Sequence, residues 1–335
     1  MMAWGGGSAL FGTQAQREAA RDRSRIVRAF FNRTRSVDRQ ALGIDRRLVT
    51  GLDADQARAV DLATGGGSGV LVVTGEAGSG KTEVLRVLAE ALEIQGKRMA
   101  VLAVAHRALH VVRCRLSNSS NVQYLTLARV LRTPSTLRGA AVVVVEEASM
   151  VDDVQMVGVL RALDSNAQLV LVGDPHQLPP MAAGTPFRTA ISSGVPVVRL
   201  RGQYRQISSS GVREFARAIR NRESLERLPG EVRLHCDLEQ PLEGLVRVVL
   251  EAGRHGSVPL VLTWRRDDWI SANIALQQTL NPSGLAVGST VMRGTKGVEN
   301  EVELRVGDRV ASTENLSGVD FYNGMTGEIR SVSGG

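Results

Sequence analysis

The stretch Gly75-Glu76-Ala77-Gly78-Ser79-Gly80-Lys81-Thr82 decides the fold of this chain. It fits the phosphate-binding loop pattern G-x-x-x-x-G-K-[ST] at every fixed position. The apolar run 70–73 before it predicts a buried strand, and the apolar spacing over 83–95 after it predicts a helix that ends near Gly96. Strand, glycine turn and helix together aim backbone N–H groups and a positive helix end at a phosphate. The alternative, a chance glycine turn, does not account for these flanking elements.

The residue types in this loop predict a magnesium nucleotide as ligand, with all eight residues 75–82 in contact with it. Glycines let the backbone pass close to the phosphates because no Cβ stands in the way. Lys81 is expected to place its ammonium on the β and γ phosphates, and Thr82 to offer a hydroxyl to Mg²⁺. The predicted cofactors are therefore ATP and Mg²⁺.

A second ATPase signature stands at Glu146-Glu147, directly after the continuous apolar run 140–145. Paired carboxylates at the end of a strand can hold Mg²⁺ and orient the attacking water. We assign Glu146 to the metal and Glu147 to the water. The alternative is a pair of surface glutamates at a strand end, which the apolar run before them disfavours.

Two further polar side chains follow buried strands. Gln177 lies after the strand predicted over 169–172, and we expect it to sense the γ-phosphate or its water. Arg205 lies beyond the strand predicted over 197–200 and is the candidate arginine finger. Arg201 is the spare candidate, although its simpler interpretation is an ordinary surface charge. A further buried strand is predicted over 99–104. Buried strands that alternate with helices predict a parallel, doubly wound α/β sheet. Ligands of such sheets bind at the carboxyl ends of the strands, where all these side chains fall.

Three features are open to two interpretations. Gln56, in a short helix that Asp53 is suited to cap, is placed to reach an adenine edge, although most helix glutamines are merely solvated. Thr126 and Arg129, at the start of a helix predicted over 126–131, are candidate contacts to a nucleic-acid phosphate. They are equally well explained as a helix cap and a surface charge.

Composition narrows the class of protein. The 335 residues allow two or three domains, and no apolar run approaches the ~20 residues of a membrane helix. No secretory signal is visible, and two distant cysteines, Cys114 and Cys236, favour a reduced, cytoplasmic protein without disulfides or a zinc site.

The net charge of +7 is concentrated at one end of the chain. Residues 1–50 hold ten arginines against four acidic residues, which is +6 from this segment. Such a basic arm fits contact with nucleic acid, and it fits a solvated helix face or a disordered arm about equally well. A helix within 16–40 is expected, with no indication of what it packs on.

A second α/β region is expected to begin near residue 210. Helices are predicted over 212–221, 245–252 and 267–280, and a strand over 258–263; β-prone runs from Gly288 onward suggest a small β-barrel-like insert. The predicted organisation is a basic N-terminal arm (1–47), a first ATPase domain (48–207), a partial second domain (208–287) and a β-rich insert (288–335).

Taken together, these blocks resemble the superfamily 1B DNA helicases of the RecD type, and most of all the helicase portion of TraA-type conjugative relaxases. The matching segments are Gln56, 75–82, 147–151, 173–180, 204–206, Asn273 with 275–276, 306–310 and 323–324. The G-D-P-x-Q-L-P-P block at 173–180 and the Y-R-Q block at 204–206 are far more specific than the phosphate loop.

The resemblance implies a RecA-like first motor domain, a second RecA-like domain with a β insert, and ATP-driven 5′ to 3′ translocation on single-stranded DNA. It places Gln56 at the adenine, Gln177 at the γ-phosphate, Arg205 as the finger and Arg107 on DNA. It also implies conjugation or recombination proteins as partners and no membrane.

The chain departs from the family pattern in four ways. Glu146 stands where an aspartate is usual, Val104-Ala105 stand where Pro-Thr is usual, and the stretch between Leu131 and Val142 is too short for a strand-separating hairpin. The family's last two motor motifs, and a relaxase nicking domain, are not found. We therefore expect an incomplete second motor domain, and keep two alternatives: a DNA-binding or regulatory module with little ATP turnover, and a phosphate-loop NTPase that acts on RNA.

Overall fold

The fold is that of a computed structural model. It describes residues 14–34, 47–65, 69–116, 119–202, 211–224, 229–230, 232, 241–254, 259–294, 298–313 and 325–331. The chain divides into two compact units, 1–223 and 224–335, which are described separately. This division falls after Glu223 rather than after Ile207, so the helix at 211–221 groups with the first unit.

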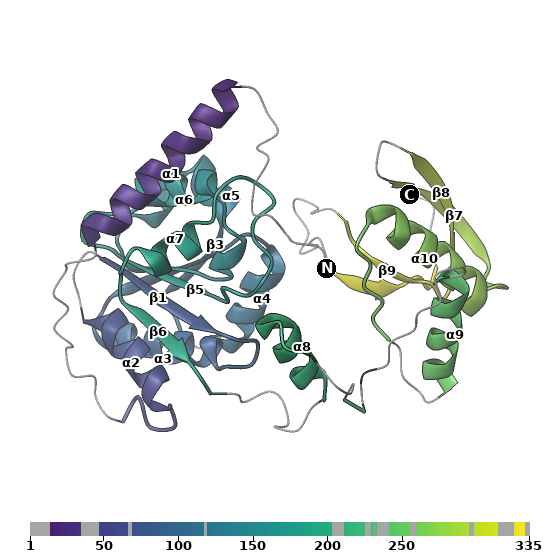
Figure 1. Cartoon of the computed structure of the whole chain (residues 1–335), viewed down its shortest axis with the longest axis horizontal. Helices are drawn as coiled ribbons and strands as arrows, with labels where there is room; N and C mark the ends of the chain where they lie inside the picture. Colours follow the sequence, from purple (N-terminus) through teal and green to yellow (C-terminus); the bar gives the residue numbers. More distant parts are fainter. Residues whose placement is uncertain are drawn as a thin grey trace. The chain divides into compact units, whose positions relative to one another are not determined.

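The first unit is built on a six-stranded parallel sheet, as the sequence predicts. The strand order is β3-β2-β4-β5-β1-β6. Figure 1 labels β3, β5, β1 and β6 of this sheet. Five of the strands lie where apolar runs predicted them, and β3 is an addition. Their bounds are β1 (Gly69–Gly75), β2 (Arg98–Ala103), β3 (Val122–Thr126), β4 (Ala140–Val145), β5 (Gln168–Gly173) and β6 (Val197–Leu200).

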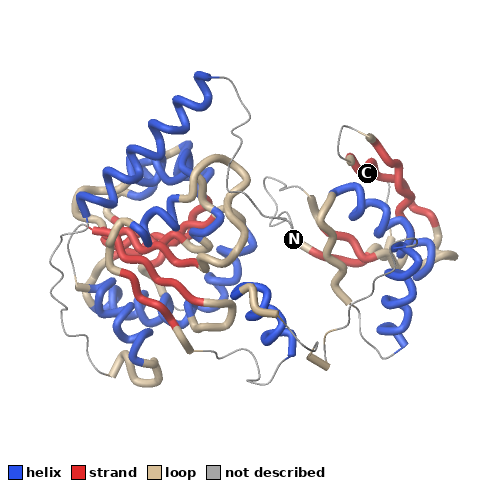
Figure 2. The backbone as a smooth tube through the Cα atoms, viewed as in Figure 1, coloured by secondary structure: helices blue, strands red, loops and turns tan. Residues whose placement is uncertain are grey.

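Helices cover both faces of this sheet (Figure 2). One face packs on α2 (Ala54–Thr64), α3 (Lys81–Ile94) and α4 (His106–Arg115). The other packs on α1 (Gln14–Thr34), α5 (Leu127–Arg132), α6 (Asp153–Ala162) and α7 (Pro186–Ser192). Two single 3₁₀ turns, η1 (Pro134–Leu137) and η2 (Ala148–Met150), and the helix α8 (Gly211–Asn221) complete the unit.

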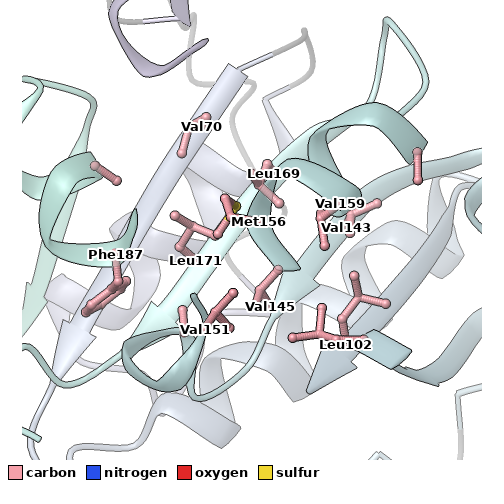
Figure 3. Packing of buried hydrophobic residues seen from close by; sticks show 14 of the residues in the cluster. Val70, Leu102, Val143, Val145, Val151, Met156, Val159, Leu169, Leu171 and Phe187 are labelled. Atoms are coloured by element: carbon pink, nitrogen blue, oxygen red, sulfur yellow. The ribbon is translucent and has the colours of Figure 1, made fainter. Parts of the chain in front are cut away.

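The central strands are apolar on both faces because both faces are covered by helices. On the α6–α7 face, Val145 and Leu171 pack with Met156 and Phe187 (Figure 3). Every one of these side chains is at most 1% exposed. This packing fixes the strand ends, and therefore the loops that follow them.

Helix α1 is part of this core, and the structure shows what it packs on. Val27 and Phe31, one turn apart, are buried in the cluster that also holds α6 and α7. The Ser24 hydroxyl donates a hydrogen bond to the buried Asp153 at the start of α6. The exposed surface of the helix carries arginines, among them Arg17, Arg21, Arg25 and Arg28.

The second unit contains two helices and two antiparallel strand pairs. Helices α9 (Pro241–Arg254) and α10 (Arg266–Leu280) pack on each other, β7 (Ala286–Arg293) pairs with β8 (Glu299–Arg305), and β9 (Arg309–Ala311) pairs with β10 (Thr326–Glu328). Asp308 ties α10 to this β region, because it accepts hydrogen bonds from Gln277 and Asn281 and from the Arg305 N–H.

The predicted strand over 258–263 is wrong for residues 259–263, which have no regular secondary structure. Leu260 and Leu262 are each 84% exposed. A strand needs a neighbour to satisfy its backbone groups, and no described strand of this unit lies beside the segment.

Within the described ranges, no helix is long and apolar enough to cross a membrane.

Candidate nucleotide and nucleic-acid site

The candidate site lies at the carboxyl edge of three adjacent strands. Strands β4, β5 and β1 are neighbours in the sheet and run in parallel, so the loops that follow them leave from the same edge. These loops carry Glu146 and Glu147, Gln177, and the phosphate-loop residues 75–82. This is the edge at which open α/β sheets bind their ligands.

The phosphate loop has the backbone that its glycines predict. Gly78 and Gly80 have φ angles of 86° and 83°, in the region that favours glycine. A Cβ on Gly75 would lie 2.2 Å from the Ser79 Oγ, so no larger residue fits there without a shift. Helix α3 begins at Lys81, so the free N–H groups at the N-terminus of this helix face the loop.

Lys81 is held by the loop itself. Its Nζ donates hydrogen bonds to the carbonyl oxygens of Gly75, at 2.7 Å, and Glu76, at 2.9 Å. Neutral carbonyl acceptors are weaker partners for an ammonium than phosphate oxygens, because hydrogen bonds between two charged groups are stronger. The ammonium is thus already positioned beside the place where a phosphate would lie.

Two buried polar atoms of the site have no protein partner. They are the Ser79 Oγ in the phosphate loop and the Glu147 Oε2 after β4. Buried polar atoms are nearly always hydrogen-bonded, so an unpartnered one needs an explanation. A nucleotide, its metal and the attacking water would supply partners, and on this count the residues fit a magnesium nucleotide.

In the acidic pair, the pKa of Glu146 is shifted and the backbone of Glu147 is strained. Burial raises the pKa of Glu146 to about 7, although the Glu147 N–H, 3.0 Å from its Oε2, and the charge of Lys81 both lower it. Glu147 has φ 50° and ψ 42°, a left-handed conformation that costs energy for a residue with a side chain. Strands β4 and β1 end at the same edge of the sheet and the charge of Lys81 acts on Glu146, which supports one site for the two ATPase signatures.

Gln177 is linked to the same site through Ser149. The Ser149 Oγ donates to the Gln177 Oε1 at 3.3 Å, which joins the loop after β4 to the loop after β5. The buried Asp174 accepts from the His176 N–H at 2.9 Å and so shapes the turn that carries Gln177. Ser149 and Asp174 are site residues that the sequence did not single out, although both lie in the blocks 147–151 and 173–180 that carry the family resemblance.

Gln56 is buried, not solvated, with 2% exposure. Its Oε1 accepts from the Asp53 N–H at 3.0 Å, and its own N–H donates to the Asp53 Oδ1 at 2.8 Å. The two residues form a capping box at the start of α2, which confirms Asp53 as the cap. Contact with an adenine stays a prediction.

The candidate DNA contacts lie at the neighbouring edge of the sheet. Arg107 is exposed in the first turn of α4, just after β2, and Thr126 ends β3 in register with Ala103 of β2. Thr126 also caps α5, because its hydroxyl accepts from the N–H of the exposed Arg129 at 3.3 Å. The simpler interpretation of Thr126 as a cap is thus confirmed, and its contact with DNA stays a prediction.

The remaining predicted site residues are Arg205, with Tyr204 and Gln206 beside it, and Thr82. Residues 203–210 lie outside the described residues, so the finger role of Arg205 stays a prediction. Arg201, the spare, is exposed.

In the described ranges no group of three or more His, Cys, Asp or Glu residues could hold a metal alone. Magnesium in nucleotide enzymes is held by one or two protein ligands together with phosphate oxygens. Thr82 and Glu146 can provide the two protein ligands.

Comparison with known proteins agrees with this geometry. A family model described as AAA domain matches residues 51–236. The chain is 28% identical over 87% of its length to the ATP-dependent RecD2 DNA helicase of Deinococcus radiodurans, of which it covers 40%. It is 29% identical over 83% of its length to the conjugal transfer protein TraA of Agrobacterium fabrum, covering 25% of that protein.

A third relative is the RecBCD enzyme subunit RecD of Mycolicibacterium smegmatis, 27% identical over 78% of this chain and 54% of that protein. The chain thus spans between a quarter and about half of the length of these three relatives. The phosphate loop, the acidic pair and Gln177 all lie within the range that the family model matches. The similarity to RecD2, TraA and RecD supports the resemblance to RecD-like helicases of superfamily 1B, and the chain belongs to the AAA domain family that the family model describes.

Proposed function

We propose that the chain binds ATP with Mg²⁺, hydrolyses it, and serves as a motor core that moves 5′ to 3′ on single-stranded DNA. The observation that carries this proposal is the meeting of Lys81, Glu146 and Gln177 at one edge of the sheet. The charge of Lys81 acts on Glu146, and Gln177 accepts a hydrogen bond from Ser149 in the loop that follows the acidic pair. The printed names of the relatives support the helicase and DNA parts of the proposal.

The proposed roles follow from the chemistry of each group. Lys81 leaves the carbonyls of the phosphate loop for the phosphates, while Thr82 and Glu146 hold the metal, which neutralises phosphate charge when bound. Glu147 orients the attacking water and accepts its proton. Gln177 donates to the γ-phosphate or the water, and Arg205 stabilises charge on the transferred group.

The proposal for the loop is tested by nucleotide binding. Fluorescent ATP analogue with Mg²⁺ is titrated into the wild-type chain and into Lys81→Ala, with the fold of both checked by circular dichroism. We expect binding by the wild type and a large loss in the variant. Equal binding by both proteins would show that the loop is not the phosphate site.

A second candidate function is a DNA-binding or regulatory module with little turnover. The exposed arginines of α1 favour it, because they would attract phosphate without any need for hydrolysis. An ATPase assay with and without single-stranded DNA separates the two functions. Phosphate release that DNA stimulates supports the motor, and DNA binding without release supports the module. RNA as the stimulator tests the remaining alternative.

We also propose that the second unit is part of a second RecA-like domain followed by a β insert. The two antiparallel strand pairs support the β insert, and the helices α9 and α10 lie where the partial domain was expected, although its expected strand does not form at 259–263. A cytoplasmic location and partners in conjugation or recombination belong to the same proposal. Arg107, Thr126 and Arg129 are proposed to contact the DNA backbone, because all three lie near the ends of β2 and β3.

A further inference from the structure

An ion pair links helix α8 to the phosphate loop. The Arg220 guanidinium donates to the carboxylate of Glu76, the second residue of the loop. The two residues are 144 positions apart in the chain, and both belong to the first unit. The Arg220 side chain is 19% exposed and that of Glu76 is 40% exposed, so the pair is partly shielded from water. Nothing in the sequence pattern indicates this contact.

The position of Glu76 makes its charge a difficulty for the proposed ligand. A carboxylate in the phosphate loop repels a polyphosphate, and a like charge is costly when it is partly desolvated. Its backbone oxygen also accepts from the Lys81 ammonium at 2.9 Å. Unless another cation offsets its charge, the carboxylate would oppose the binding of the nucleotide.

Arg220 is well placed to remove this difficulty. Ala218 is 1% exposed, so one side of α8 is covered, and Arg220 follows on the same helix. Arg217, one turn earlier, makes a looser pair with Glu223 at 3.9 Å and is 62% exposed. Of these two arginines, Arg220 is the one that forms an ion pair with the phosphate loop.

We propose that Arg220 is a positioning residue for the nucleotide: it neutralises the Glu76 carboxylate, so that the phosphate loop accepts a polyphosphate. This inference rests on the proposed binding of ATP. It assigns two cations to two tasks, Lys81 to the phosphates and Arg220 to the acidic side chain of the loop. Arg220 itself makes no contact with the reacting atoms in this proposal.

A double-variant experiment tests it, with affinity for a fluorescent ATP analogue and Mg²⁺ as the readout. Arg220→Ala should raise the Kd by about tenfold, because the Glu76 carboxylate loses its ion pair with Arg220 and its negative charge then repels the phosphates more strongly. Adding Glu76→Gln to that variant should restore the Kd to within about threefold of wild type, because the repelling charge is gone. Arg217→Ala, the matched control on the same helix, should change the Kd by less than about threefold.

Turnover provides a second readout. At saturating ATP, Arg220→Ala should keep kcat within about threefold of wild type while KM rises, since the repulsion weakens binding of the ground state and of the transition state equally. Glu76→Gln alone should bind ATP as tightly as wild type or more tightly, and this holds even if Arg220→Ala does not fold. Unchanged Kd in Arg220→Ala, weaker binding in Glu76→Gln, or no rescue in the double variant would each overturn the inference. If the wild type binds no ATP, the proposed function fails instead.

Discussion

The hydroxyl of Ser149 donates a hydrogen bond to the side-chain oxygen of Gln177, 3.3 Å away. The bond ties the loop of the acidic pair to the loop of the γ-phosphate sensor. It uses the oxygen of the Gln177 amide, so the Nε2 group is the part that would donate to a phosphate oxygen. A change at the nucleotide can therefore affect both loops together.

Gln177→Ala should leave ATP binding close to wild type and reduce kcat. A donor that acts on charge developed in the transition state is worth ~10²–10³ in rate when it is removed. Steady-state phosphate release at saturating ATP measures the effect. Ser149→Ala, which only loosens the orientation of Gln177, should lose much less. Wild-type turnover by Gln177→Ala would remove Gln177 from the mechanism.

Glu147→Gln should trap bound ATP. The amide cannot accept a proton from the attacking water, while the phosphate loop that binds the nucleotide is unchanged. Single-turnover measurements should show normal binding and a large loss in the hydrolysis step. If the variant turns over normally, the role of general base passes to Glu146.

Arg205→Ala should slow hydrolysis with little effect on ATP binding. A finger residue acts mainly in the transition state, and arginine fingers in related chemistry contribute ~10³–10⁵ in rate. The kcat of the variant, compared with that of Arg201→Ala, checks the assignment. A loss below about tenfold in Arg205→Ala would point to Arg201 or to the absence of a finger.

Phe31→Ala should destabilise the first unit by about 3–5 kcal/mol, because it removes a buried aromatic side chain and leaves a cavity. Phe31 has 0% exposure in the cluster that joins α1 to α6 and α7. Denaturant unfolding followed by far-UV circular dichroism measures the change. Ile26 lies on the same helix and is 43% exposed. Ile26→Ala should therefore lower the free energy of unfolding by less than about 0.5 kcal/mol. Equal losses would mean that α1 does not dock as described.

Acid should weaken the second unit through Asp308. Burial raises the pKa of Asp308, but hydrogen bonds from Asn281, from the Arg305 N–H and from Gln277, with the charge of Arg305, bring it below 3.8. A lowered folded pKa contributes stability above the unfolded pKa of about 3.9, and this stability is lost as the pH falls through the folded pKa. The stability of the unit should therefore drop below about pH 4.

The test of this pH dependence uses Asp308→Asn, which removes the charge and keeps the shape. The variant should be less stable than wild type at pH 7 and should lose less on acidification. Trp264 and Trp269 lie in the second unit, so their fluorescence, in a Trp4→Phe background, reports its unfolding. Parallel pH curves for the two proteins would show that Asp308 does not carry the effect.

The strands of the first unit were predictable because burial on both faces leaves a plain sequence signal. The runs 140–145 and 169–172 are wholly apolar, and each forms the strand that was expected. Strand β3 was missed because it is an edge strand, with only Leu125 of its residues fully buried. Its residues 122–126 therefore lack a continuous apolar run.

Contacts between distant residues could not be predicted from the sequence. The loop pattern and the acidic pair identify the ligand class, because their chemistry is carried by local spacing. The bond between Ser149 and Gln177, and the pair of Arg220 with Glu76, depend on strand order and helix placement, which no local pattern encodes. The same limit explains the error over 259–263, where apolar content was typical of a strand but no described strand lies beside it.

The docking of α1 has a practical consequence for anyone who wishes to produce this domain. The family match begins at residue 51, yet Val27 and Phe31 fill part of the core on the α6–α7 side. A shortened protein that starts at the match would expose the apolar surface beneath α1 and tend to aggregate during purification. The smallest piece that folds well is therefore expected to begin upstream of α1, well before the residue at which the family match starts.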